Sequence, residues 1–301
     1  MKETIRQILL TTGASAVGFA KAGEIDGNVA DSYDLWIKDG CNAGMSYLHK
    51  HSSLRRHTDN VLEGANTVIS LAFSYSPEKW LDHKIFQIAC YAYGEDYHEV
   101  IRKFLFPKIE ELKQMFGGKW RLCIDSAPVA ERYWALTSGI GIKGDNGAVI
   151  VEGCGSLCFL AEILTSLQIE PDLPLKKDCG HCRQCIAACP TGALKNDGFI
   201  DSRLCINYLT IEKKDDFSDE EKNFLKRASY PLFGCDRCLK VCKHNHNIKP
   251  TSIKEFQLSE SIKKISCDEI LGMNELDFSE KFGNSPFKRS GLAGLKRNIQ
   301  I

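Results

Sequence analysis

Eight of the fourteen cysteines are spaced as ligands for iron. The run Cys179-Gly-His-Cys-Arg-Gln-Cys-Ile-Ala-Ala-Cys-Pro190 places three thiolates at steps of three, followed by a fourth and a proline. This spacing is typical of iron–sulfur ligand runs. A second run, CDRCLKVC over residues 235–242, repeats part of the spacing, and Cys205 lies between the two runs. Eight thiolates are the ligand set of two [4Fe–4S] clusters.

The two runs are expected to exchange ligands, because the last cysteine of each run binds the other cluster in proteins with two such centres. One cluster is therefore expected at Cys179, Cys182, Cys185 and Cys242, and the other at Cys189, Cys205, Cys235 and Cys238. Zinc and disulfides fit less well. Zinc sites use two separated pairs of ligands, and disulfides need an oxidising compartment, whereas the N-terminus carries no signal-peptide pattern.

The remaining cysteines share no spacing that suggests a metal. Cys90 and Cys123 lie among apolar residues, and we expect them to be small buried side chains. Cys154 and Cys158 have three residues between them, but the surrounding sequence indicates a turn that enters a strand.

The chain has 301 residues and a formal net charge of zero, so no global field points to nucleic acid. The distribution of charge is uneven, since residues 281–301 contain five basic residues and no acidic one. This tail, with Lys213, Lys214, Lys226 and Arg227, offers candidates for contacts with RNA phosphates. No apolar run of 18 residues exists, so we expect no membrane span and a cytoplasmic protein.

Hydrophobic periodicity predicts the elements that position these groups. Helices are expected over residues 4–12 and 96–116, the second with a kink or break at Pro107, and strands over 14–20, 66–75 and 119–124. A capping box of Ser218 with Glu221 predicts one later helix, and Ser266 with Glu269 suggests another helix start. The alternation favours an α+β fold, with an α/β/α domain over residues 1–170, a two-cluster domain over 171–250 and a C-terminal helical tail over 251–301.

A large α/β domain next to two clusters indicates a redox enzyme. The dinucleotide motif Gly-x-Gly-x-x-Gly is missing after every expected strand, so a nicotinamide or flavin dinucleotide is not indicated. The segment from Asp96 begins like the Asp-x-His-x-x-Gly motif of some cobalamin proteins, but Ile101 stands where glycine belongs. The residues alone leave the second cofactor open.

The segment IDSAPVAER over residues 124–132, followed by the glycine-rich loop 139–146, resembles the signature of the epoxyqueuosine reductase family. Other blocks resemble the family in the same order: GMSYL at 44–48, Arg55, YAYGEDYH at 91–98, FLAEILT at 159–165, CINYLTIE at 205–212 and FGCDRC at 233–238. The likeness covers nearly the whole chain.

This resemblance implies a function. The family removes the epoxide oxygen of epoxyqueuosine at the wobble position of tRNA, in the last step of queuosine synthesis, with base-off cobalamin and two [4Fe–4S] clusters. It implies a cobalamin domain related to flavin-reductase-like cobalamin-processing proteins, an electron donor of the flavodoxin or ferredoxin type, and a monomer. Carried over by motif, Asp125 is the proton donor and a cofactor neighbour, and Arg55, Tyr97 and His98 contact the cobalamin.

For Asp125 to donate a proton at neutral pH, burial against the cofactor would have to raise its pKa. The alternative interpretation is that Asp125 caps a helix starting near Val129. Glu131 and Arg132 are expected to form an ordinary exposed turn, and His98 is as compatible with a structural role at a helix start as with a cofactor contact. His181 is expected to pack near a cluster without binding it.

The chain departs from the family pattern at Ile142 and Asp145, where an aromatic residue and a cation are usual. If that loop lines the substrate pocket, these residues alter its contacts. Many relatives carry a C-terminal helical-repeat extension, which we expect to be absent from this chain. Two other functions stay open: a reductase of another substrate, as in reductive dehalogenases, and a non-catalytic electron carrier of the ferredoxin type.

Overall fold

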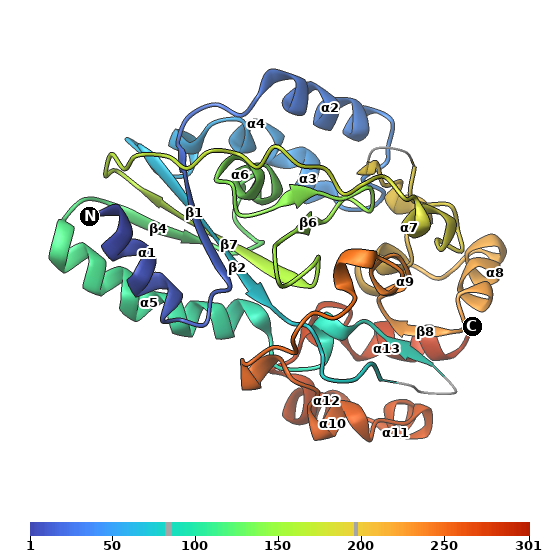
Figure 1. Cartoon of the computed structure of the whole chain (residues 1–301). Coiled ribbons are helices and arrows are strands. Elements are labelled where there is room, and N and C mark those ends of the chain that lie inside the picture. The colour runs from blue at the N-terminus through green and yellow to red at the C-terminus, as the bar shows by residue number, and fades with distance from the viewer. Residues whose placement is uncertain (82–85, 196–197) are drawn as a thin grey trace.

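A four-stranded antiparallel sheet organises the first half of the chain (Figure 1). The computed structural model describes residues 1–81, 86–195 and 198–301. The strands lie in the order β1 (Ala16–Lys21), β2 (Thr67–Ser74), β7 (Cys158–Thr165) and β4 (Trp120–Cys123), and each neighbouring pair is antiparallel. Every residue of β2 is buried, because helices cover both faces of the sheet.

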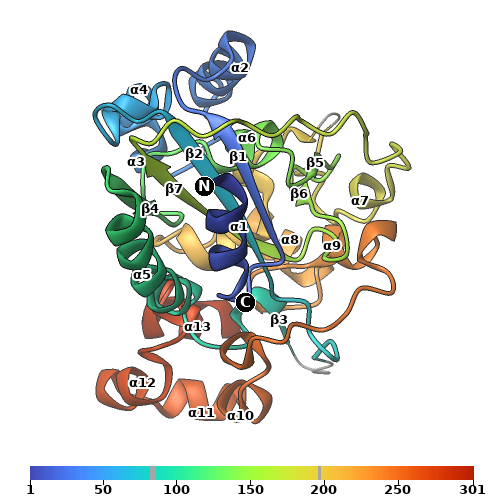
Figure 2. The same ribbon diagram turned by 60° about the vertical axis from the view of Figure 1, so that its left-hand side comes forward.

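The two faces of the sheet alternate along each strand. Ile69 and Leu71 of β2 pack in the main core with α1 (Lys2–Leu10) and α5 (Tyr97–Phe116). Val68 faces the opposite side, where it packs with Trp134 of α6 (Glu131–Thr137). The first part of the chain is thus layered helix, sheet, helix, as the period-2 alternation in the strands requires (Figure 2).

The predicted elements of this part are present within a few residues of their expected bounds. Helix α5 nevertheless runs unbroken from Tyr97 to Phe116 with Pro107 inside it, so the expected break is wrong. The missing N–H at Pro107 is tolerated because Ile101, Leu105 and Ile109 bury one side of the helix in the core. The capping box at Ser218 and the N-cap at Ser266 are confirmed.

Short elements fill the second half of the chain and the loops of the first. Their bounds are α2 (Gly27–Lys38), α3 (Ser46–Lys50), α4 (Ser52–Arg55), β3 (Gln87–Ile88), β5 (Ile142–Lys143), β6 (Val149–Ile150), α7 (Gln184–Ala187), α8 (Asp219–Arg227), β8 (Pro231–Phe233), α9 (Arg237–Lys240), α10 (Glu260–Lys263), α11 (Cys267–Gly272), α12 (Glu275–Phe282) and α13 (Gly291–Ile299). No helix in the described part of the chain has the length and apolar composition needed to cross a bilayer.

Long-range contacts tie the second half of the chain to the first half. Strand β3 pairs in parallel with β8, and α13 packs against β8. The segment before the first cysteine run is held by Asp172, which accepts hydrogen bonds from Arg6 at 3.0 Å and from the amide of Phe19 at 3.0 Å, and pairs with Lys2 at 2.7 Å. Helices α10 to α12 gather at one end of the molecule (Figure 1).

Candidate active site and cluster cavity

Asp125 lies just beyond the end of β4, in a left-handed backbone conformation with φ of 50°. Its side chain keeps 63% of its exposure. One oxygen, Oδ2, accepts a hydrogen bond from the Tyr97 hydroxyl at 3.1 Å and lies 3.3 Å from His98 Nε2. The other oxygen, Oδ1, has no hydrogen-bond partner among the described residues and is open to a ligand. The structure therefore brings Asp125 together with Tyr97 and His98, which precede it in the sequence by 28 and 27 residues.

The N-terminus of α5 supplies the partners of Asp125. Asp96 is the N-cap of this helix, and its carboxylate accepts the backbone N–H of His98. The same oxygen lies 2.7 Å from His98 Nδ1, and the other oxygen pairs with Lys288 Nζ at 2.5 Å. Asp96 is buried, with a side chain only 3% exposed. Lys288, Asp96, His98 and Asp125 thus form one continuous row of charged groups.

The charges in this row set where the proton resides. The hydrogen bond from His98 lowers the pKa of Asp125, against the opposing effect of burial. Burial alone would lower the pKa of His98, but hydrogen bonds to Asp125 and Asp96 raise it to about 9. The sequence-based requirement of a raised pKa at Asp125 is therefore not met by the protein alone, and at neutral pH the proton lies on His98.

Asp125 does not cap the following helix, so that alternative interpretation is wrong. Helix α6 begins at Glu131 after Ala130, without a side-chain cap. Glu131 instead turns back, and its Oε1 accepts the backbone N–H of Asp125. This contact fixes the left-handed residue at the end of β4, whereas Arg132 is exposed as expected.

A second acid lies behind Glu131 and was missed in the sequence. Glu162 on β7 is fully buried, and among the described residues neither carboxyl oxygen has a hydrogen-bond partner. It occupies one row across the sheet with Ser70 on β2 and Cys123 on β4. Burial, followed by the charge of Glu131, raises the pKa of Glu162 well above its usual range. The available signal was a lone acid in the apolar strand FLAEILT.

Aromatic and cationic groups surround the open side of Asp125. Tyr97 stacks on Phe159 at 4.2 Å between ring centroids and on His98 at 4.0 Å. Arg289, from the C-terminal part, makes two 2.7 Å hydrogen bonds to Glu212 and lies 5.6 Å from the centroid of the Tyr47 ring. Its charge contributes to the lowered pKa of Asp125. Glu212 was not singled out in the sequence, because Arg289, which was expected there only as part of the basic tail, lies 77 residues later in the chain.

Arg55, at the end of α4, carries an unsatisfied donor. Its Nη1 atom is buried and has no hydrogen-bond partner among the described residues. A buried guanidinium nitrogen without an acceptor is costly in a folded protein. An amide or phosphate oxygen of a bound cofactor would satisfy it, which makes this residue compatible with the cobalamin contact expected from the sequence.

Four of the eight cysteines line one cavity. Cys179, Cys182, Cys185 and Cys242 surround it together with Lys243, His244 and the loop 144–146. Three of these cysteines come from the first run and one from the second, which is the expected division. Soft thiolate sulfur is the ligand that iron–sulfur clusters take, so this donor set fits a cluster.

The other four cysteines lie near one another between the first run and α9. The charges of Cys235, Cys205 and Cys189 each act on the Cys238 thiol, whose pKa is raised first by burial. The segment is anchored to the turn that follows β3 by Asp236, a buried residue whose Oδ2 accepts the backbone N–H of Cys90 at 2.6 Å. Cys90 and Cys123 are themselves buried apolar side chains, as expected.

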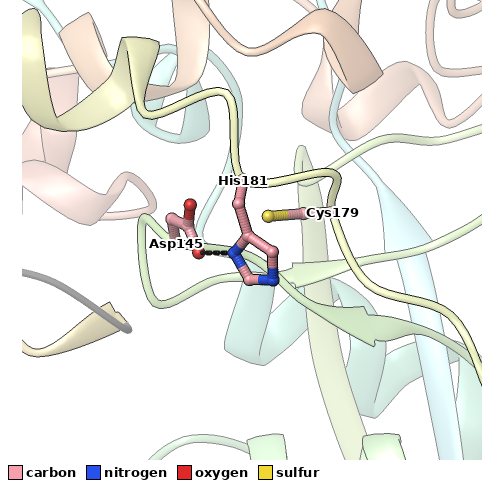
Figure 3. Close-up of side chains that lie close together, drawn as sticks. All are labelled: Asp145, Cys179 and His181. Atoms are coloured by element: carbon pink, nitrogen blue, oxygen red, sulfur yellow. Dashed lines mark hydrogen bonds and ion pairs between the residues drawn. The ribbon is translucent and has the colours of Figure 1, made fainter.

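The departure from the family pattern at Asp145 falls beside the cysteine cavity (Figure 3). Asp145 is buried, and its Oδ1 lies 2.8 Å from His181 Nδ1. The ring of His181 and the sulfur of Cys179 lie within 4.8 Å of that carboxylate. The loop therefore contacts the cluster side of the molecule, and Ile142 lies nearby in the short strand β5.

The basic residues expected to meet RNA are largely engaged within the protein. Lys281 pairs with Glu269, Lys288 with Asp96, and Arg289 with Glu212. Lys296 donates to the carbonyl of Met273, Arg297 to that of Lys213, Lys214 to that of Arg289, and Lys213 pairs with Glu221. Three of the five basic residues of the tail are thus paired with acids, and the other two donate to backbone carbonyls of earlier segments.

A layered α/β domain carrying an open aspartate, joined to a cysteine-rich region with two sets of four thiols, defines a class of iron–sulfur oxidoreductases. Family comparisons agree. A model described as "4Fe-4S double cluster binding domain" matches residues 178–245, and one described as "Epoxyqueuosine reductase QueG, DUF1730" matches residues 55–126.

Individual relatives are similar over nearly the whole chain. Epoxyqueuosine reductase of Cyclobacterium marinum is 37% identical over 96% of this chain and 94% of its own length, and that of Leadbetterella byssophila is 38% identical over 90% and 88%. The chain belongs to the epoxyqueuosine reductase family.

Solved structures agree with this assignment. The structure of epoxyqueuosine reductase from Streptococcus thermophilus aligns with a TM-score of 0.89 at 28% identity, covering 99% of this chain and 80% of that one. A crystal structure of epoxyqueuosine reductase with an epoxyqueuosine-modified tRNA stem loop aligns with a TM-score of 0.89 at 27% identity, covering 99% and 79%.

Proposed function

We propose that this chain reduces epoxyqueuosine to queuosine in tRNA, with Asp125 delivering a proton to the substrate oxygen. The observation that carries the assignment to this chain's residues is the open carboxylate of Asp125, whose Oδ2 is held by Tyr97 and His98 while Oδ1 is free among the described residues. Family membership supports the reaction, and the tRNA stem loop bound by a relative supports the substrate.

The two sets of four cysteines are proposed as the ligands of two [4Fe–4S] clusters. Cys179, Cys182, Cys185 and Cys242 would hold the cluster in the lined cavity, and Cys189, Cys205, Cys235 and Cys238 the other. Cys182 is exposed, so the first cluster is the one closer to an external electron donor. A flavodoxin- or ferredoxin-type protein that gives one electron at a time suits this entry point.

Cobalamin is proposed as the second cofactor, next to Asp125. When bound, it supplies a reduced cobalt centre that passes electrons to the substrate. The residues that fit it are Arg55, with its unsatisfied Nη1, and Tyr97 and His98 beside the open carboxylate. We further propose that the large domain spans about residues 1–170 and the cluster domain 171–250, followed by a helical tail, and that the protein acts as a cytoplasmic monomer.

The role of Asp125 follows from the chemistry of an opening epoxide. Breaking a carbon–oxygen bond leaves negative charge on oxygen, and a nearby acid stabilises that charge by giving it a proton. The carboxyl of Asp125 reaches the site from the end of a rigid strand, and Glu131 fixes its backbone. Tyr97 and His98 cover one oxygen of the carboxyl, and Phe159 stacks on the Tyr97 ring.

Replacing Asp125 by asparagine tests this role. Asp125→Asn keeps an acceptor for Tyr97 but has no transferable proton, so turnover should fall by at least about 100-fold. The measurement is nucleoside analysis of epoxyqueuosine-containing tRNA after anaerobic incubation with the reconstituted protein. Iron and cobalt contents should match those of the wild type. Full turnover by Asp125→Asn with both cofactors bound would show that another group donates the proton.

The two alternative functions are less well supported. Membership of the epoxyqueuosine reductase family favours epoxyqueuosine over a halogenated substrate. If the protein were an electron carrier without catalysis, the open carboxylate of Asp125 and the charged groups behind it, His98, Asp96 and Lys288, would have no role. Absorbance of the reconstituted protein separates this alternative, because corrin bands should accompany those of the clusters.

A further inference from the structure

The reaction needs more protons than one aspartate holds. Removing an epoxide oxygen as water breaks two carbon–oxygen bonds, forms one carbon–carbon double bond, and consumes two electrons and two protons. The clusters and their protein donor supply the electrons. Asp125 holds at most one proton at a time, and its hydrogen bond from His98 favours the ionised form. A second group must therefore load Asp125.

His98 is placed to do so. Its Nε2 faces Asp125 Oδ2 at 3.3 Å, and its Nδ1 faces the buried carboxylate of Asp96 at 2.7 Å. Asp96 is itself held by Lys288 at 2.5 Å. The buried carboxylate orients the ring and stabilises its charged form, so the Nε2 proton points at Asp125. This arrangement, an imidazole between a buried carboxylate and a working group, recurs where histidine moves protons in catalysis.

We propose that His98, oriented by Asp96 and Lys288, stores the proton that Asp125 delivers to the departing substrate oxygen. The inference rests on the proposed role of Asp125. His98 carries the proton at rest and Asp125 is ionised. As negative charge develops on the substrate oxygen, the Nε2 proton moves to Asp125 Oδ2 and the carboxyl passes a proton to that oxygen, which leaves a neutral imidazole and an ionised carboxylate. The His98 side chain is 28% exposed and takes its next proton from water. Two such transfers supply the two protons that the reduction consumes.

The polar and charged neighbours of this pair come from three parts of the chain. Asp96 and Tyr97 belong to the start of α5, Glu131 to α6, Lys288 to the segment before α13, and Arg289 approaches Asp125 from the same segment. The acids among them favour a charged His98, and its pKa of about 9 keeps it protonated at neutral pH. Above about pH 9 the store empties, so turnover should decline.

The first test uses the protein without cobalamin. Histidine titration followed by NMR, with His98→Gln to assign the signal, should show His98 holding its proton well above pH 7. Asp96→Asn is the matched variant, because asparagine still caps α5 but lacks the charge that faces Nδ1. It should lower the His98 midpoint by more than one pH unit. A wild-type midpoint at or below pH 6.5 would overturn the proposal.

The second test uses the reconstituted enzyme and its pH profile. The wild type should lose kcat above about pH 9, and Asp96→Asn should move this decline to lower pH by the shift measured in the titration. His98→Gln should lower kcat by at least about 100-fold, with KM little changed. Tyr97→Phe removes the other hydrogen bond to Oδ2 but no titrating partner of His98, so its decline should stay near pH 9.

The outcomes separate this inference from the function on which it rests. If the wild type reduces epoxyqueuosine and Asp125→Asn does not, while His98→Gln keeps both the rate and the alkaline decline, the proton store is wrong and the role of Asp125 stands. If the wild type reduces no epoxyqueuosine, the function itself fails, whatever the titration of His98 shows.

Discussion

Asp125 and His98 share one proton, and the position of that proton is a property of their neighbours. A solvent-exposed histidine titrates near pH 6.5, whereas His98 lies between two carboxylates that raise its pKa to about 9. Because its folded pKa is raised, His98 adds stability that is fully present below about pH 6.5 and is lost as the pH rises through about 9. The site is therefore most stable and most completely protonated at neutral and mildly acidic pH.

Glu162 also has a raised folded pKa, but burial rather than a charged hydrogen-bond partner is the main cause. Its folded pKa is raised by burial, so the folded protein keeps a proton that the unfolded chain releases above about pH 4.5. Stability should fall with rising pH by up to about 1.4 kcal/mol per unit from this residue. Glu162→Gln has no proton to lose, so its melting temperature relative to wild type should rise between about pH 5 and pH 8.

Thermal unfolding of the anaerobic protein, followed by circular dichroism at several pH values, measures this difference. Glu280→Gln, an exposed position on α12, is the control and should follow the wild type at every pH. A Glu162→Gln variant whose melting temperature keeps a constant offset from wild type would mean that Glu162 is ionised in the folded protein.

At the scale of elements, the segment before the first cysteine run is fastened rather than free. Asp172 joins α1 and β1 through Arg6, Lys2 and the amide of Phe19. The composition of residues 169–178 predicts a linker, and most of their side chains are indeed exposed. Asp172 could not be recognised as an anchor of this segment, because its partners lie more than 150 residues earlier in the chain.

Asp172→Asn should lower the free energy of unfolding by about 1–3 kcal/mol, the usual range for hydrogen bonds to a charged group. The pKa of Asp172 is lowered in the folded state, burial being outweighed by Lys2 and Arg6, so its contribution is present above about pH 4 and lost as the pH falls through the folded value. Chemical denaturation at pH 7 and at acidic pH measures both effects. Asp31→Asn, an exposed change on α2, is the control, and equal stability of Asp172→Asn and wild type would contradict the anchoring role.

At the scale of the whole molecule, distant segments converge on both sites. Lys288 and Arg289 are adjacent in the sequence but pair with acids from different segments. Lys288 pairs with Asp96 at the start of α5, and Arg289 pairs with Glu212 in the segment between the two cysteine runs. The proposed clusters likewise draw ligands from both cysteine runs, so each cluster links parts of the chain that are more than 45 residues apart. Replacing one cysteine should therefore remove the cluster that it binds, which includes a ligand from the other run, and leave the second cluster in place.

Paired cysteine variants test this exchange. Cys182→Ser and Cys242→Ser should each reduce iron from about eight to about four atoms per chain, and the double variant should also keep about four, because both residues serve one cluster. Cys182→Ser combined with Cys189→Ser should lose nearly all iron, although both residues belong to the first run. Iron analysis after anaerobic reconstitution measures this, and the reverse pattern would assign each cluster to a single run.

The sequence by itself determined the features that depend on local spacing. The cysteine runs, the strands ending at Ser74 and Cys123, the helix starting at Tyr97 and the capping box at Ser218 all follow from neighbouring residues. Resemblance of sequence blocks added the family and Asp125. These inferences hold because hydrogen bonds in turns, helix caps and strand alternation act over a few residues.

Only the tertiary structure decided where the protons and charges lie. Whether Asp125 is protonated depends on His98, and the charge of His98 depends on Asp96, whose other oxygen is held by Lys288 from 192 residues later. Distant residues also meet where Glu131 lies near the buried Glu162, and where three basic residues of the tail pair with acids from earlier segments. A pKa is set by burial and by charges within a few ångströms, and the fold alone brings such distant residues that close.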